Sequence, residues 1–127
     1  MKRHKTREKV ISLLKGGTYP VYVGIEESII RNALCNADQV SLLTVPCNSI
    51  SAGCRRIMEM IPSELDEILV SVKFRNISFS LSTLAPLIEI LADYNENANT
   101  TWGISIDENI SCEIEINVLF IIKQILE

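Results

Sequence analysis

The chain has 127 residues, of which 47% are apolar and 22% are charged, and its net charge is −4. This length suits one domain of roughly 100–150 residues, and the apolar fraction excludes a chain that is disordered throughout. Residues 1–9 carry a net charge of +4 and the other 118 residues a net charge of −8, so the acidic body argues against nucleic acid as a partner.

The chain begins with a basic segment, residues 1–9, which we interpret as an N-terminal tail before a single domain over residues 10–127. Charged and apolar residues alternate over residues 2–15 in a pattern that also fits a short amphipathic helix, which Gly16-Gly17 would end. Residues 19–25 are rich in β-branched and aromatic side chains and predict a first strand.

Two helical patterns and one ambiguous segment follow. Residues 27–36 and 51–61 each carry apolar side chains at helical spacing, and Pro62 ends the second helix. Residues 39–45 fit either a short strand or an extended loop that Pro46 stops. The sequence leaves these two alternatives open.

The next segment predicts a strand followed by a helix. Apolar side chains alternate from residue 68 onward, which gives one apolar and one mixed face: Ile68, Val70, Val72 and Phe74. Ser82 or Thr83 can cap a helix that runs through residue 93. Its predicted buried stripe is Leu84, Leu87, Ile88 and Leu91.

The C-terminal part predicts two further strands joined by a tight hairpin. Residues 102–106 alternate, residues 107–111 form a turn, and residues 113–123 alternate again. In this last strand Ile114, Ile116, Val118, Phe120 and Ile122 share one face, and Glu113, Glu115 and Asn117 share the other. A strand with one apolar and one polar face predicts an α+β two-layer sandwich, in which helices pack on one face of a four-stranded mixed sheet.

Several motifs in this order resemble the C-terminal domain of FtsZ, the tubulin-like bacterial cell-division GTPase. They are Asn97-Ala-Asn-Thr-Thr-Trp-Gly-Ile-Ser-Ile-Asp-Glu108, then Glu113-Ile-Glu-Ile-Asn-Val118, with Leu81-Ser-Thr-Leu84 upstream. The glycine pair and strand of residues 16–26 are also similar to the start of that domain. The resemblance covers about residues 65–123 and 13–26, and residues 27–63 do not align.

The resemblance implies an FtsZ-like C-terminal domain that lacks the family's GTPase domain. The family's GTPase domain and glycine-rich phosphate signature are missing, and the acidic loop that completes GTP hydrolysis has only Glu8 in the corresponding basic segment. We therefore expect no enzyme and no cofactor, but a protein-interaction or assembly module linked to cell division or filament assembly. The expected partner is a second copy, as in a homodimer, or an FtsZ-type subunit, docked on the open sheet face or on the edge strand near residues 19–25.

Four charged residues are the candidate partner contacts. Arg55 and Arg56 could clamp a partner's carboxylates, although such residues usually lie on the water-facing side of a helix. Glu113 and Glu115, two residues apart, could form an acid–base pair, but a solvated sheet face explains them as well. Asp107 and Glu108 are best explained by the turn.

The four cysteines do not predict a metal site. Cys35, Cys47, Cys54 and Cys112 form no C-x-x-C pair, and the only histidine is His4. No secretory signal or membrane-spanning run of about 20 apolar residues is present, so a cytoplasmic protein with free thiols is expected.

An alternative function is a small ligand-binding domain or a chorismate-mutase-like oligomeric enzyme on the same architecture. Such an enzyme would bind a dicarboxylate through several convergent cations. They would have to come from Arg31, Arg55, Arg56 and Arg75 of adjacent subunits.

Overall fold

The structure, a computed structural model, describes residues 2–15, 21–62, 65–76, 81–94 and 98–123. Its elements in chain order are α1 (Lys2–Lys15), β1 (Val21–Val23), α2 (Glu27–Cys35), β2 (Ala37–Cys47), α3 (Ile50–Met60), β3 (Glu67–Phe74), a 3₁₀ turn (Leu81–Leu84), α4 (Ala85–Tyr94), β4 (Asn99–Ile106) and β5 (Ile114–Lys123). The α+β class and the mixed sheet are as predicted. The segment interpreted as a basic tail is helical from Lys2 onward, and Gly16-Gly17 lies outside the described residues.

The sheet has five strands in the order β1-β4-β3-β5-β2, so the prediction of four strands is wrong. The ambiguous segment around residues 39–45 is a full strand, which pairs antiparallel with β5 along its whole length and includes Pro46. β3 is parallel to β4 and antiparallel to β5, and β1 pairs antiparallel with β4 at the other edge.

The predicted hairpin between the last two strands is also wrong. The turn at residues 107–113 does join β4 to β5, but β3 lies between them, and neither strand pairs with the other. The reason lies in burial, because β3 is buried on both faces along nearly its whole length. A strand with two apolar faces is most stable in the middle of a sheet, where it is covered on both sides.

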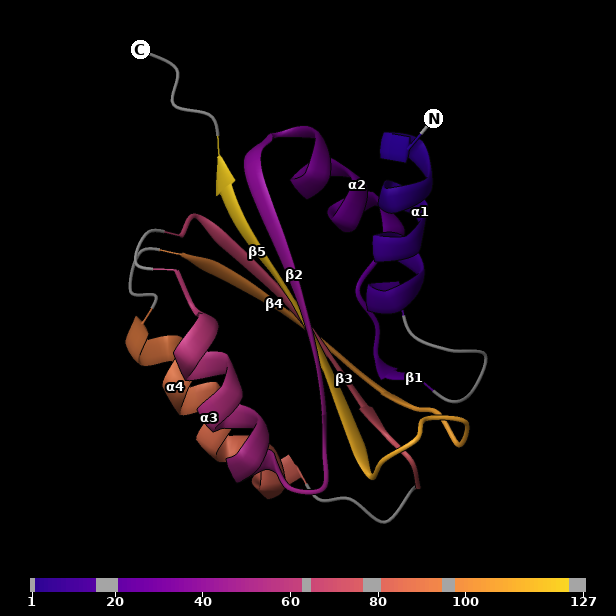
Figure 1. Cartoon of the computed structure of the whole chain (residues 1–127), viewed down its shortest axis with the longest axis vertical. Coiled ribbons are helices and arrows are strands. Elements are labelled where there is room, and N and C mark those ends of the chain that lie inside the picture. Colours follow the sequence, from indigo (N-terminus) through magenta and orange to yellow (C-terminus); the bar gives the residue numbers. More distant parts are fainter. Residues whose placement is uncertain (1, 16–20, 63–64, 77–80, 95–97, 124–127) are drawn as a thin grey trace.

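Helices cover both faces of the sheet, which corrects the prediction of helices on one face. Figure 1 shows α3 and α4 on one side of the sheet and α1 and α2 on the other. The α3–α4 side holds the larger core, around Ile57, Val70 and Val118. On the α1–α2 side Leu69, Leu119 and Ile121 are fully buried against residues of both helices, such as Leu14 and Ile30.

Two local predictions about buried side chains have different outcomes. Trp102 packs against the larger core, and Cys54 is buried there. Ile88, which was assigned to the buried stripe of its helix, is 46% exposed, so that assignment is wrong. Leu84, Leu87 and Leu91 do form the buried stripe.

Candidate interaction edge

The two edges of the sheet differ greatly in length. β1 is three residues long, whereas β2 is eleven residues long and pairs only with β5 among the described strands. In Figure 1, β2 runs down the middle of the view in front of the other strands, between the two helical layers. A long edge strand offers unpaired backbone groups to another chain, and proteins commonly protect such an edge by shortness, charge or proline. By these criteria the short β1 is protected against pairing with another chain, whereas most of the long β2 is not.

The pairing of β5 determines which backbone groups of β2 are free. The backbone nitrogens of Asp66 and Arg75 donate to the carbonyl oxygens of Ile121 and Glu113, at 3.0 and 2.9 Å, so the odd-numbered residues of β5 bond toward β3. The even-numbered residues therefore bond toward β2. In β2 their partners are Gln39, Ser41, Leu43, Val45 and Cys47.

The alternate residues of β2, Val40, Leu42, Thr44 and Pro46, consequently direct their backbone groups away from the sheet. Pro46 lacks an N–H group, and at this position its nitrogen would have had no partner in β5. Val40 is 49% exposed, and Leu42 is half-buried against the α1–α2 core. The free edge thus combines open donors and acceptors with apolar side chains.

A groove accompanies this edge on the α3 side. One depression of about 420 Å³ is lined by Thr44, Val45, Pro46, Cys47, Ala52 and Arg56. A second, of about 140 Å³, is lined by Gln39, Val40, Ser41, Pro62, Phe120 and Ile122. Both depressions lie along β2, the first beside α3 and the second beside the proline that comes after this helix, so a strand added to the edge would run next to them.

Helix α3 is fixed beside β2 by its first residues. Its N-cap, Ser49, accepts a hydrogen bond from the backbone nitrogen of Ala52 at 3.3 Å, which satisfies one of the free donors of the first turn. Gly53 then lies so close to the sheet that an added Cβ would come within 2.7 Å of Ile116 Cδ1 and 3.0 Å of Cys47 Sγ. This close approach holds α3 near the last residues of β2, which line the larger depression together with Ala52 and Arg56.

The structure separates the four predicted contact residues. Arg55 and Arg56 are exposed on α3, and Arg56 lines the larger depression. Glu113 lies before β5 and pairs with Arg75 at 3.1 Å. Glu115 lies within β5 and has Lys73 as its cationic neighbour instead, so the two glutamates belong to different ion pairs.

Glu115 belongs to a polar row across the α1–α2 face of the sheet. Lys73, only 7% exposed, places its Nζ 3.9 Å from Glu115 Oε1. Asn117 donates through Nδ2 to the same oxygen at 3.0 Å, and Thr44 of the edge strand donates through Oγ1 to Asn117 Oδ1 at 2.8 Å. The row therefore connects the buried sheet to the free edge through Thr44.

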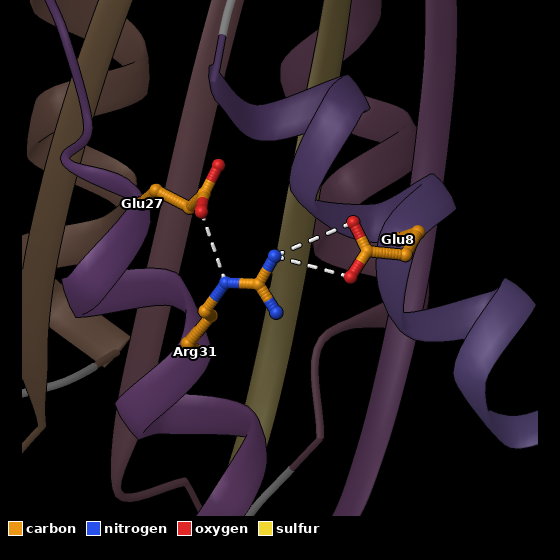
Figure 2. Close-up of polar contacts among 3 residues, drawn as sticks. All are labelled: Glu8, Glu27 and Arg31. Carbon is orange, nitrogen blue, oxygen red and sulfur yellow. Dashed lines mark hydrogen bonds and ion pairs between the residues drawn. The ribbon is translucent and has the colours of Figure 1, made fainter.

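The arginines that the alternative enzyme hypothesis requires lie in different places within one chain. Figure 2 shows Arg31 of α2 between Glu27 of its own helix and Glu8 of α1, with nitrogen–oxygen distances of 3.0 and 3.1 Å. The hydrogen bonds that Arg31 donates to Glu27 and then to Glu8 raise its pKa. Arg75 contacts Glu113 and the carbonyl of Ile110 instead, so Arg31 and Arg75 serve structural pairs within the chain.

The cysteines are free thiols. Burial raises the pKa of Cys47, with a smaller effect from Cys112, and burial alone raises the pKa of Cys54. In the described part of the chain no group of three His, Cys, Asp or Glu side chains has the arrangement of a metal site. Over the same residues, no helix is long and apolar enough to cross a membrane.

No protein-family model matches the chain, and no curated protein is significantly similar to it in sequence. The kinship with FtsZ therefore stays a prediction from the sequence. The sequence predicts a docking edge near residues 19–25, whereas the long edge of the sheet is β2. Pro46, next to a run of alternating polar and apolar residues, was the signal for an edge strand.

Proposed function

We propose that the chain is a non-catalytic protein-interaction or assembly module, which binds an extended segment of a partner along the edge of β2. The observation that carries this proposal is an eleven-residue edge strand beside a groove, whose outward backbone groups at Val40, Leu42 and Thr44 meet no further strand in the part of the chain that the structure describes. In this mode of recognition the main-chain hydrogen bonds supply affinity, and the alternate side chains supply specificity.

The groove adds features that an extended ligand can use. Its wall combines the small side chain of Ala52 with the guanidinium group of Arg56, so an added strand meets an apolar floor and one cation. An acidic residue of the partner would pair with Arg56 through charge-assisted hydrogen bonds. The partner is then a protein, either a second copy or an FtsZ-type subunit. The second of these partners, like a role in cell division or filament assembly, rests on the sequence resemblance.

A displayed library of random decapeptides tests the proposal. Peptides selected on the wild-type chain should lose binding to Val40→Pro, because proline removes an outward donor without breaking a bond to β5. Val40→Thr keeps the N–H group and the β-branched shape, so it is the matched control and should bind like wild type. Bound peptide should also slow hydrogen exchange at Val40, Leu42 and Thr44.

Two results would overturn the proposal. One is the selection of no peptide above background. The other is a set of peptides that binds Val40→Pro as tightly as the wild-type chain while both proteins are folded by urea titration.

A further inference from the structure

We infer that the segment that occupies this edge is β2 of a second copy, paired antiparallel about a two-fold axis so that one continuous sheet crosses both chains. This inference rests on the proposed function, because it names the partner of the same edge. A two-fold axis perpendicular to the sheet would also continue both helical layers from one copy into the other, since each layer stays on its own side of the sheet.

The position of Pro46 selects the register. With Leu42 opposite Leu42 of the second copy, Val40 of each chain faces Thr44 of the other, and each of these pairs exchanges two backbone hydrogen bonds. Pro46 then falls opposite residue 38, at the two ends of the interface, where its missing N–H group costs least. Registers that bring Pro46 toward the centre lose donors in the middle of the shared ladder.

The side chains at the centre of this arrangement are apolar. Val40, which is 49% exposed in the single chain, would lie beside Thr44 of the second copy. The half-buried Leu42 would lie beside its own counterpart, on the α1–α2 side of the sheet. Cross-strand neighbours of this kind stabilise antiparallel pairs.

The charges at the two ends are complementary. Asp38 lies near the start of β2 and Arg56 lines the groove at its other end, and neither has an ion-pair partner among the described residues. An antiparallel two-fold pairing brings Asp38 of each copy to the Arg56 end of the other. The interface therefore gains two ion pairs that one chain cannot form. A parallel pairing would not bring them together.

Sedimentation equilibrium over a wide concentration range tests the inference with the full chain. The wild-type chain should reach the mass of two chains, and Val40→Pro should weaken association by about thirtyfold, since each copy loses one backbone hydrogen bond. Ile88→Lys, at a site of similar exposure on α4 (46%), is the matched control and should leave the dimer unchanged.

A charge swap tests the register. Asp38→Arg and Arg56→Asp should each weaken the dimer by about tenfold at low salt, because each replaces two attractive pairs with repulsive ones. The double variant Asp38→Arg/Arg56→Asp should restore wild-type association. Circular dichroism and urea unfolding establish that every variant is folded, and the charge variants keep the test decisive if Val40→Pro does not fold.

Three results would overturn the inference: a wild-type chain that stays monomeric at its highest soluble concentration, a dimer that Val40→Pro leaves intact, or a charge swap that does not restore association. The first of these would leave peptide binding by the edge to be decided by the library selection alone. Failure of this inference is thus distinguishable from failure of the proposed function.

Discussion

Replacement of Gly53 by Ala should destabilise the chain, although alanine is the better helix former. Gly53 lies inside α3, where a glycine costs about 1 kcal/mol relative to alanine. Its backbone approaches the sheet so closely that the alanine Cβ would come within 2.7 Å of Ile116 Cδ1, a contact that requires one of the two groups to move. Ile116 is fully buried in the larger core and has little space to move into.

The magnitude follows from these opposing effects. An extra methyl group in a well-packed core costs about 1–3 kcal/mol, and the gain in helix propensity offsets about 1 kcal/mol of it. We expect Gly53→Ala to lower the free energy of unfolding by about 1 kcal/mol. In an Ile116→Val background, which lacks the offending Cδ1, the same substitution should be neutral or stabilising.

Urea unfolding of the wild type, the two single variants and the double variant provides the measurement. Ile116→Val alone should cost about 0.5–1.5 kcal/mol for the lost methyl group. The cycle should therefore show a favourable coupling of about 1–2 kcal/mol between residues 53 and 116. A Gly53→Ala variant more stable than wild type, or a penalty that persists in the Ile116→Val background, would refute the reasoning that α3 is closely packed on β5.

Four further outcomes follow from individual side chains. Ser105 Oγ is buried and has no hydrogen-bond partner among the residues that the structure describes, so Ser105→Ala should raise the free energy of unfolding by about 1 kcal/mol in urea titrations, and a clear loss would contradict this. Arg31→Ala should lower Tm by at most a few degrees in calorimetry, and the difference should vanish at high salt because its ion pairs are exposed. Burial raises the pKa of Cys47 and Cys54 above the ordinary value of 9.0. The contribution of the two protonated thiols to the free energy of unfolding should therefore be complete below pH 9 and should decrease as the pH rises further. Iodoacetamide should accordingly modify the exposed Cys35 first, as peptide mass spectrometry can show.

The elements could be predicted from the sequence because each has a local cause. The helix of residues 51–61, for example, shows its buried stripe at Cys54 and Ile57, and a proline follows it. The arrangement of strands has no such local cause. Alternation over residues 102–106 indicates a strand but carries no information about which other strand lies beside it, so the short connection to β5 predicts a hairpin that the structure does not form.

The second helical layer was missed although the sequence held a signal for it. Leu119 and Ile121 interrupt the polar face of the last strand, and Leu69 does the same in β3. All three are fully buried against α1 and α2. The polar residues at 113, 115 and 117 predict a face that is open to solvent. They account for only one half of this sheet face, however, and the other half is apolar. A run without alternation, as in residues 118–121, is typical of a strand that is covered on both faces.

Pro46 links the fold to the proposed edge more directly than any charged residue does. Its nitrogen points away from β5, so a strand that added beyond β2 would meet a position with no donor, and β2 is suited to an edge rather than to the middle of a sheet. The same proline lies one residue before the end of β2, which leaves the donors of Val40, Leu42 and Thr44 open. A proline near the centre of the strand would have protected the edge against any partner. Its place near the end instead restricts the edge to partners in a narrow range of registers, which is the behaviour expected of a specific interface rather than of a strand that aggregates.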